Sequence, residues 1–269
     1  MSDVLGVVQA RMSSSRLPGK VLEPILGKPM IICQLERLAR CTRLSDIVVA
    51  TSTDSEDDHL AEVVREAGWE VFRGPQEDVL GRFITVLDAR PSPAIARLTA
   101  DCPLTSPEVV DLVVGAFEAA DVDYLSNTLE PTYPDGLDVE VVRTEALERI
   151  ANTSTDPHER EHVTLGVYRR PDEFRIQSFT DPLGRDHSGL RWTVDNTDDL
   201  TFVRDVYAAL LPTHPHFEYD DVLRWLQQNP DANRTTDHAP RNAALDGLDT
   251  GAMHHPGNER KPNDAGGPQ

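Results

Sequence analysis

The sequence contains few cysteines, no basic leader and no long apolar segment. Its three cysteines, Cys33, Cys41 and Cys102, are not spaced as disulfide or metal-binding pairs usually are, which favours a reducing compartment. No apolar run approaches the length that spans a bilayer, and no basic residues precede an apolar stretch at the N-terminus, as they do in an ordinary signal peptide. We therefore expect a soluble cytoplasmic protein with no membrane partner.

Basic residues are also scarce relative to acidic ones. The chain has 26 Lys and Arg against 46 Asp and Glu, a formal net charge of −20. This excess of negative charge argues against nucleic acid or an anionic membrane surface as the main partner. It also makes any local cluster of cations informative. With 269 residues, 39% of them hydrophobic, the chain can bury one substantial core.

One such cluster lies in residues 4–20, VLGVVQARMSSSRLPGK. The apolar run 4–8 predicts a short buried strand, and Arg11, Arg16 and Lys20 follow it with no acidic residue among them. Small residues between the cations let backbone N–H groups approach a ligand closely. Amides, hydroxyls and cations just past the carboxyl end of a strand suit a polyphosphate, although the spacing is not that of a Walker A loop. An ordinary surface loop with solvated cations is the alternative.

The first 120 residues alternate between strand-like and helix-like segments. We predict strands at 4–8, 46–51, 69–72 and 94–99, and helices from 29, over 55–67, from about 76 and from 106. This alternation predicts an α/β fold with a mostly parallel sheet flanked by helices. Because ligands of such sheets bind beyond the carboxyl ends of the strands, the loops 10–20, 51–54, 73–78 and 100–102 should share one edge.

The alternation breaks after Tyr124. Further strands are predicted at 137–142, 174–179 and 190–194, and helices at 157–168 and 197–211. We interpret residues 1–230 as a single domain with a small mixed insertion at about 127–190. Residues 231–269 have almost no aliphatic clusters, so we predict a disordered C-terminal tail.

The segment ARMSSSRLPGK resembles the signature loop of the sugar-activating cytidylyltransferases, the group that contains acylneuraminate and 3-deoxy-manno-octulosonate cytidylyltransferases. VVATSTD and TADCPL match further motifs in the family's order, and the similarity runs from about Val4 to about Leu226. Within the group, the chain is most similar to the spore-coat polysaccharide biosynthesis protein F type. The resemblance implies a Rossmann-like domain of the nucleotide-diphospho-sugar transferase type, a homodimer, and an insertion that serves the acceptor and dimerisation.

The activity that the resemblance implies is transfer of CMP from CTP to a small acidic sugar or related acceptor, with release of pyrophosphate, for cell-surface polysaccharide or related glycan biosynthesis. Asp101 and Asp195, each just past a predicted strand, would bind the cofactor Mg²⁺. Unbridged, two such carboxylates are expected to repel. Each aspartate has a turn or helix cap as its alternative role, and Asp198 and Asp199 compete with Asp195. The expected catalytic residues are Arg11, Lys20, Asp101 and Asp195.

By the same resemblance, the nucleotide is contacted by Ala10, Arg11, Met12, Ser13, Arg16, Lys20, Ala50, Thr51, Asp54, Arg73, Gly74, Asp78 and Thr99. The acceptor is contacted by Arg97, Asn127, Tyr133, Asp135, Gly136, Asp138, Glu140 and His162. Structural roles compete at two of these positions: Asp54 suits the N-cap of the following helix, and Asp78 suits a salt bridge to Arg82 at i,i+4.

Two other classes of enzyme stay open. The segment HEREH, residues 158–162, fits the H-E-x-x-H pattern of zinc metallohydrolases. Against it, Pro157 places His158 in the first helical turn, and no third ligand follows. In the preferred interpretation His162 lies near the acceptor and Glu159 is a solvated helix charge. The second alternative is a glycosyltransferase, which would use a preformed nucleotide sugar and would release a nucleoside diphosphate or monophosphate.

Overall fold

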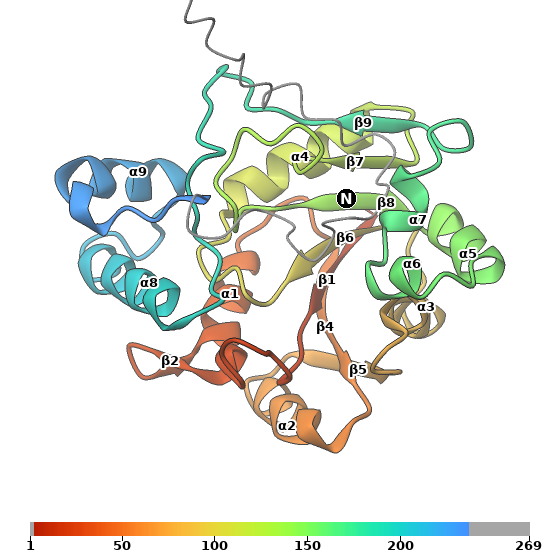
Figure 1. The fold of residues 1–269 in the computed structure, drawn as a ribbon, viewed down its shortest axis with the longest axis horizontal. Helices are drawn as coiled ribbons and strands as arrows, with labels where there is room; N and C mark the ends of the chain where they lie inside the picture. Colours follow the sequence, from red (N-terminus) through yellow and green to blue (C-terminus); the bar gives the residue numbers. More distant parts are fainter. Residues whose placement is uncertain (1–2, 237–269) are drawn as a thin grey trace, which may run out of the picture.

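A seven-stranded sheet runs through the computed structural model of the chain, which describes residues 3–236 (Figure 1). Its strands are β1 (Val4–Gln9), β4 (Asp46–Ser52), β5 (Glu70–Gly74), β6 (Ala94–Thr99), β7 (Tyr124–Ser126), β8 (Glu140–Arg143) and β9 (Ile176–Ser178), in the spatial order β5-β4-β1-β6-β8-β7-β9. Within this sheet only β8 runs antiparallel to its neighbours. The predicted α/β fold with a Rossmann-like, mostly parallel sheet is confirmed.

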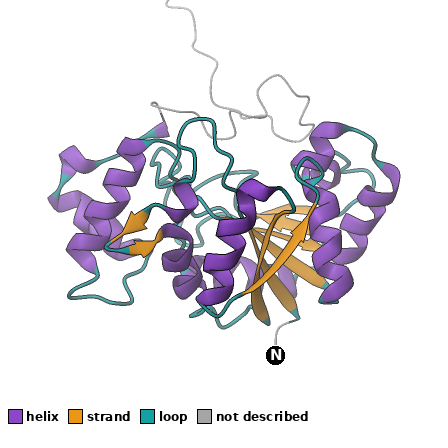
Figure 2. Cartoon of the chain, turned by 90° about the horizontal axis from the view of Figure 1, so that it is seen from below, coloured by secondary structure: helices purple, strands orange, loops and turns teal. Residues whose placement is uncertain are grey.

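Helices cover both faces of the sheet (Figure 2). One face packs against α1 (Met30–Leu38), α2 (Asp58–Glu66), α4 (Pro107–Ala119), α8 (Thr197–Leu210) and α9 (Tyr219–Gln228), and the other against α3 (Val79–Ala89), α5 (Thr144–Thr153) and α7 (Leu165–Tyr168). Because both faces are covered, the central strands are almost entirely apolar. In β1, for example, Val7 and Val8 point to opposite faces and both are fully buried.

The helices predicted in the first half of the chain are present. α4 begins directly after the predicted cap, Ser106, and α2 ends shortly before Gly68, whose φ of +89° suits a helix C-terminus. The third helix begins later than predicted, at Val79. The reason is that the Asp78 carboxylate accepts a hydrogen bond from the N–H of Gly81 and so caps the helix. A short hairpin of β2 (Pro24–Ile25) and β3 (Lys28–Pro29) precedes α1.

The second half of the chain differs more from the prediction. The helix expected over 157–168 is divided into α6 (Pro157–Glu161) and α7, because Val163 adopts a positive φ of 34° that interrupts the helical path. The stretch 190–194, expected as a sheet strand, contributes only two isolated bridges, one from Arg191 to Asp135 and one from Leu190 to Thr235. Helices α5 and α9 have no counterpart in the prediction.

The folded part of the chain also extends further than predicted. Disorder is predicted over 231–269, yet residues 231 and 232 belong to a 3-10 turn, Pro230–Ala232, and residues 233–236 continue from it and bond to the domain. The N–H of Arg191, for instance, donates to the carbonyl of Arg234 at 2.9 Å. The prediction is therefore wrong for these six residues, and the rest of the predicted tail, 237–269, lies outside the described residues.

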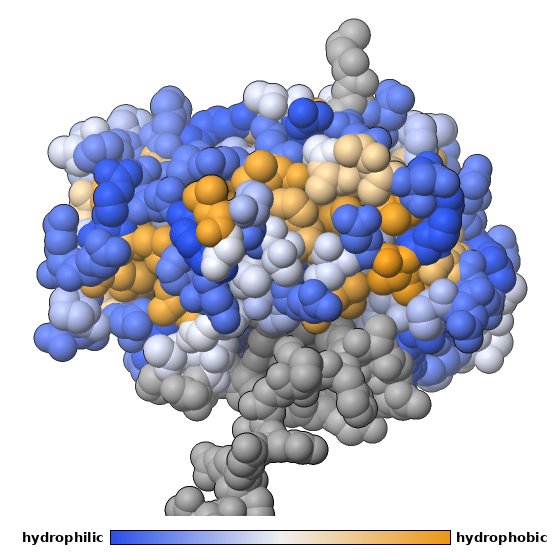
Figure 3. Space-filling model, turned by 90° about the horizontal axis from the view of Figure 1, so that it is seen from above, coloured by the Kyte–Doolittle hydropathy of each residue, from blue (hydrophilic) through white to orange (hydrophobic). Residues whose placement is uncertain are grey.

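The surface carries mainly hydrophilic side chains. In the view of Figure 3 they surround several smaller apolar patches. Among residues 3–236 the exposed large hydrophobic side chains are Leu26, Leu112 and Leu183. No helix in this part of the chain is long and apolar enough to cross a bilayer. The surface thus agrees with the high net charge of the sequence.

Gly136 allows two connections to pass directly against each other. Its φ is +112°, a conformation that side chains rarely adopt. A Cβ at this position would lie 2.6 Å from the backbone nitrogen of Thr193 and 2.7 Å from the carbonyl carbon of Trp192. Because these neighbours are backbone atoms, they cannot move aside at low cost.

We expect Gly136→Ala to destabilise the fold by roughly 3 kcal/mol, combining φ strain with a backbone clash. The melting temperature should then fall by roughly 6–12 °C. Gly184→Ala is the matched control, because Gly184 also has a positive φ, +70°, but no heavy atom lies within 4 Å of the position that a Cβ would take there. It should cost only about 1 kcal/mol. Equal losses in the two variants, measured by calorimetry, would show that the close approach at Gly136 contributes nothing.

Candidate functional site

The basic loop after β1 folds back on itself and is fastened to the neighbouring loop. Gly19, at φ +74°, donates its N–H to the carbonyl of Met12 at 2.9 Å and so closes the loop. The N–H of Met12 donates to Asp57 Oδ1 at 2.7 Å, and Asp57 also accepts from the hydroxyl of Ser52. Asp57 is buried, so one carboxylate ties the loop after β1 to the loop after β4. The sequence analysis did not identify this residue, since one acid among several after a strand carries no distinguishing signal.

Lys20 lies at the end of the basic loop and is enclosed by three oxygen atoms. Its Nζ is 3.0 Å from Asp101 Oδ2, 3.0 Å from Asp195 Oδ1 and 2.7 Å from the carbonyl oxygen of Val194. The residue is only 8% exposed. The structure therefore brings the two predicted carboxylates together, but a cation bridges them, and the expectation of an unbridged, repelling pair is wrong.

The pKa shifts of Lys20 and Asp101 both favour their charged forms. Burial disfavours the charged form of Lys20, but Asp101 and Asp195 outweigh it and raise the pKa of the ammonium group. Burial likewise disfavours the Asp101 carboxylate, yet the Lys20 charge lowers the pKa of Asp101 below its ordinary value. Burial, Asp101 and Asp138 together raise the pKa of the Cys102 thiol, so this cysteine stays protonated beside the ion pair.

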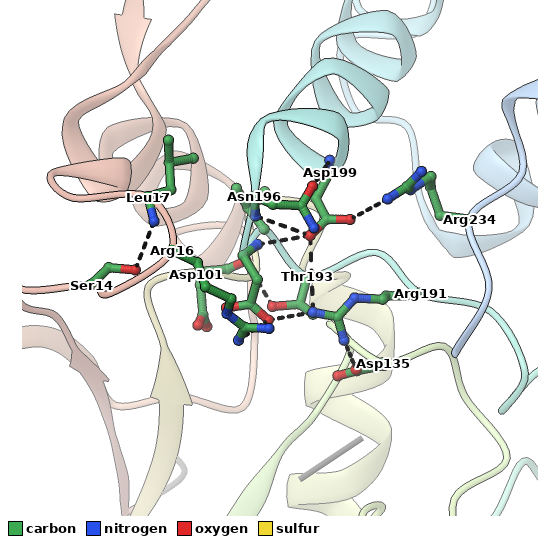
Figure 4. Close-up of polar contacts among 12 residues, drawn as sticks. Ser14, Arg16, Leu17, Asp101, Asp135, Arg191, Thr193, Asn196, Asp199 and Arg234 are labelled. Atoms are coloured by element: carbon green, nitrogen blue, oxygen red, sulfur yellow. Dashed lines mark hydrogen bonds and ion pairs between the residues drawn. The ribbon is translucent and has the colours of Figure 1, made fainter. Parts of the chain in front are cut away.

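Asp195 is held through both its side chain and its backbone. Arg16 Nη2 lies 2.9 Å from Asp195 Oδ2, which also pairs with Arg191. The N–H of Asp195 donates to Asp199 Oδ2 at 3.0 Å, and Asp199 completes the capping box at the start of α8. Figure 4 shows Arg191 extended between Asp135 and this group. Asp199 thus acts as a cap, and Arg191 is a site residue that the sequence analysis missed.

Main-chain hydrogen bonds join the segments that carry the two carboxylates. The N–H of Val194 donates to the carbonyl of Asp101 at 2.8 Å, and the Thr193 hydroxyl donates to the same oxygen at 3.2 Å. The N–H of Ala100 donates to the carbonyl of Gln9 at 3.0 Å, which keeps the ends of β6 and β1 side by side. The predicted convergence of these loops on one edge of the sheet is therefore observed.

The predicted nucleotide-binding residues lie around this edge. Ala10 donates its N–H to the carbonyl of Ala50 at 3.0 Å, so β1 and β4 stay paired to the point where both loops begin. Arg11 is exposed just past β1, and no acid among residues 3–236 forms an ion pair with it. Thr51 is fully buried, and its hydroxyl has no hydrogen-bond partner within the described part of the chain. Met12 and Ser13 begin the basic loop, and Gly74 and Thr99 end β5 and β6.

Three further residues of this predicted set have structural partners. Arg73 Nη2 donates to the carbonyl of Asp54 at 2.8 Å and stiffens the loop after β4. Asp54 itself caps the 3-10 turn that follows, in agreement with the alternative role considered for it. Asp78 caps α3 and pairs with Arg160. The i,i+4 pair between Asp78 and Arg82 does not form, because the Arg82 guanidinium donates to main-chain carbonyls instead.

Arg97 and Glu140, predicted to contact the acceptor, form an ion pair across β6 and β8. Glu140 also accepts from the hydroxyls of Tyr124 and Thr164, each at 2.7 Å. Arg97 Nη2 donates to Gln9 Oε1 at 3.2 Å. Burial opposes ionisation of Glu140, but Arg97 and these hydroxyls outweigh it and lower the pKa of Glu140. The pair is therefore a charged, hydrogen-bonded group within the sheet.

The other predicted acceptor residues are divided between structural and exposed positions. Both ends of the Asn127 amide bond to the main chain before β8, and Tyr133 is buried among aromatic rings. Asp135 Oδ2 accepts from Arg191 at 2.6 Å. His162 is half-buried, and burial lowers the pKa of its imidazole, which keeps it neutral at pH 7. Gly136 and the partly exposed Asp138 lie in the connection before β8.

The HEREH segment does not have the geometry of a zinc metallohydrolase. α6 ends at Glu161, and His162 caps it. Glu159 is buried, lies 3.0 Å from Arg170 and accepts from Ser154, so the expectation of a solvated charge is wrong. Among residues 3–236 no group of three or more His, Cys, Asp or Glu side chains could hold a metal ion.

The oxygen atoms around Lys20 form a donor set that suits a different metal. Asp101 and Asp195 provide carboxylates, and Val194 provides a carbonyl, around a position already occupied by positive charge. Mg²⁺ prefers oxygen ligands and is commonly bound by one or two carboxylates together with substrate phosphates. The residues present therefore fit the predicted magnesium site.

A mostly parallel sheet, a cationic loop past its first strand and neighbouring carboxylates at the same edge are the features of a nucleotidyltransferase. A family model described as cytidylyltransferase matches residues 5–208. The chain is 32% identical over 239 residues to the spore coat polysaccharide biosynthesis protein SpsF of Bacillus subtilis, covering 86% of this chain and 97% of that one. It is 32% identical over 198 residues to 3-deoxy-manno-octulosonate cytidylyltransferase 2 of Hydrogenovibrio crunogenus, covering 66% and 78%.

Among solved structures, a cytidylyltransferase from Leptospira borgpetersenii is similar with a TM-score of 0.81 and 29% identity, covering 86% of this chain and 97% of that one. The chain therefore belongs to the cytidylyltransferase family. The resemblance to the sugar-activating cytidylyltransferases, inferred from the basic loop and the two strand-end motifs, is confirmed.

The Lys20 ion pairs predict a pH-dependent loss of stability in Lys20→Met. Asp101 has a lowered pKa, so its pairing stabilises the fold above pH 3.8, its ordinary pKa, and this is lost as the pH falls through the folded value. Lys20 has a raised pKa, so its contribution is present below pH 10.5 and is lost as the pH rises through the folded value. Both contributions are present at neutral pH.

At pH 7 we expect Lys20→Met to lose about 2 kcal/mol, or roughly 4–8 °C in melting temperature, because, among residues 3–236, Asp101 is left without a cation and Asp195 keeps only Arg16 and Arg191. The difference from wild type should narrow as the pH approaches 4, where protonation of Asp101 removes its unpaired charge. Lys28→Met is the control, since Lys28 forms an exposed pair with Glu36 and its loss should change little. A difference independent of pH between 4 and 7, by thermal denaturation at about one-unit steps, would contradict the ion-pair explanation.

Proposed function

We propose that this enzyme transfers CMP from CTP to a small acidic sugar or related acceptor and releases pyrophosphate. The observation that carries the proposal is the arrangement at one edge of the sheet, where Lys20 pairs with Asp101 and Asp195, Arg16 pairs with Asp195, and Arg11 lies exposed just past β1. The names of the relatives support the nucleotide and the class of acceptor, since one is a 3-deoxy-manno-octulosonate cytidylyltransferase and another a polysaccharide biosynthesis protein.

The reaction needs little covalent chemistry from the protein. A hydroxyl oxygen of the acceptor forms a bond to the α-phosphorus of CTP, and the bond from that phosphorus to the oxygen leading to the β-phosphate breaks. Pyrophosphate leaves with its electron pair, and the hydroxyl proton passes to solvent or a base. Catalysis of such a step consists of positioning and of neutralising charge on the phosphates. The exposed Arg11 and the half-exposed Arg16 would bind the phosphates.

Asp101 and Asp195 would hold the predicted Mg²⁺, which supplies positive charge at the α-phosphate when bound. In the absence of nucleotide Lys20 neutralises both carboxylates. Its Nζ is therefore already at the place where a phosphate chain would arrive, and its ammonium group can donate to a phosphate oxygen. The protein thus provides cations from one loop and carboxylates from two others.

On the acceptor side we propose that Arg97 attracts the acid group of the acceptor. Arg97 donates to Gln9, the last residue of β1, and its Nε has no hydrogen-bond partner within residues 3–236. His162, kept neutral by burial, would donate or accept a hydrogen bond without adding charge. We also propose that the enzyme is a cytoplasmic homodimer, an oligomeric state that light scattering of the purified chain measures.

The proposed nucleotide and acceptor can be tested by a pyrophosphate-release screen that crosses four nucleoside triphosphates with a panel of acidic sugars, with and without magnesium. We expect release with CTP, magnesium and an acidic acceptor together, because the cationic loop suits a triphosphate and Asp101 and Asp195 suit the metal. A neutral analogue of each acidic acceptor serves as the control. Preference for ATP would contradict the proposed nucleotide, and release of a nucleoside diphosphate from a nucleotide sugar would indicate a glycosyltransferase.

The shared role of Asp101 and Asp195 predicts non-additive losses of activity. Asp101→Asn and Asp195→Asn should each lower kcat about 100-fold or more, because each removes a charge that acts in the transition state. The double variant should lose far less than the product of the single losses, since both side chains serve one cation. Asp46→Asn, at an exposed pair with Arg90, is the control and should keep its activity. Multiplicative losses in steady-state kinetics would show that the two carboxylates act separately.

A further inference from the structure

The segment 231–236 lies beyond the part of the chain that the family model matches, yet it ends beside the carboxylates of the site. The N–H of Arg191 donates to the carbonyl of Arg234 at 2.9 Å, and the N–H of Thr236 donates to the carbonyl of Gly189 at 3.0 Å. These two main-chain bonds fix the segment along the stretch of chain that leads to Asp195.

Arg234 pairs with Asp199, the buried carboxylate at the start of α8. Its Nη2 lies 3.1 Å from Asp199 Oδ1 (Figure 4). The other oxygen of Asp199 accepts from the N–H groups of Asp195 at 3.0 Å and Asn196 at 3.2 Å. Asp199 is 1% exposed, so its charge would be costly to bury without a cation nearby. Arg234 therefore neutralises the carboxylate that holds the backbone of Asp195.

Arg191 connects Asp199 to the side chain of Asp195. One of its terminal nitrogens, Nη2, pairs with Asp195 Oδ2 and lies 4.0 Å from Asp199 Oδ2, while Nη1 lies 2.6 Å from Asp135 Oδ2. Three carboxylates thus surround one buried guanidinium. With Arg234 in place, Asp199 has a cation of its own. Without it, Asp199 would attract Arg191 away from Asp195.

We propose that Arg234 is a positioning residue for Asp195 in nucleotidyl transfer. It neutralises Asp199 and thereby keeps Arg191 and the Asp195 carboxylate in the arrangement that faces Lys20. The proposal rests on the proposed function, in which Asp195 acts at the α-phosphate. Arg234 lies outside residues 5–208, the region that the family model matches, so the proposal gives a residue beyond that region a part in the reaction.

The first test compares three variants of the full chain with wild type in pyrophosphate release from CTP. Arg234→Gln should lower kcat about 10- to 100-fold, as loss of an outer partner of a site carboxylate does, with little change in KM for CTP. Arg234→Lys should recover most of the loss, because it restores the charge. Arg224→Gln is the matched control, since Arg224 is exposed, lies in the preceding helix and pairs with Asp221. It should behave as wild type.

A second test separates charge from structure. Asp199→Asn in the Arg234→Gln background removes the unpaired charge but keeps an oxygen that can accept from the N–H of Asp195. This double variant should have a higher kcat than Arg234→Gln alone. Melting temperatures of all variants show whether each is folded.

The outcomes distinguish a failure of the proposed function from a failure of the role proposed for Arg234. A folded wild type without CTP-dependent pyrophosphate release overturns the proposed function and the role of Arg234 with it. An active wild type with an equally active Arg234→Gln overturns the role of Arg234 alone. A loss in Arg234→Gln that is absent neither from Arg234→Lys nor from the double variant with Asp199→Asn also overturns it, because Arg234 would then serve only the fold.

Discussion

One ammonium group determines how this site is built. Lys20 Nζ lies among three oxygen atoms that come from the end of β6 and from the segment before α8. Without that cation, two partly buried carboxylates would face each other at the edge of the sheet, and their mutual repulsion would oppose the approach of the segments that carry them. The ion pairs therefore make it possible for the fold to hold its acids close together before a nucleotide arrives.

Around this centre the chain balances charge locally, although its overall charge is strongly negative. Each acid of the site pairs with at least one cation: Asp101 and Asp195 share Lys20, Asp135 pairs with Arg191, and Asp199 pairs with Arg234. Arg11, exposed at the end of β1, is the cation of the loop that no acid within residues 3–236 neutralises. Because the local charges balance, a polyanion that approaches the site is not repelled by a large local excess of negative charge.

The sequence was sufficient to predict the parallel strands β1, β4, β5 and β6 and several of the residues that meet at their carboxyl ends. The strand over 4–8 is a local apolar run, three cations after it are unusual in an acidic chain, and Asp101 follows a buried strand at a fixed offset. These are short-range signals. The carboxylates that Lys20 contacts lie 81 and 175 positions further along the chain. No local sequence pattern indicates that the Lys20 ammonium group bridges these two carboxylates. The buried ion pair of Glu159 with Arg170 was missed for the same reason: a helix charge looks solvated until the tertiary structure covers it.

The docking of residues 231–236 has a consequence for how the protein is made. The site joins the basic loop at residues 11–20 to Arg234, so it draws on nearly the first and nearly the last residues that the structure describes. The ribosome synthesises the chain from its N-terminus at a limited rate, so the basic loop emerges well before Arg234. A growing chain that already contains the whole sheet would therefore still lack part of the charge network. Nascent chains should remain catalytically weak until synthesis has passed residue 236, and only then can the carboxylates acquire their full set of partners.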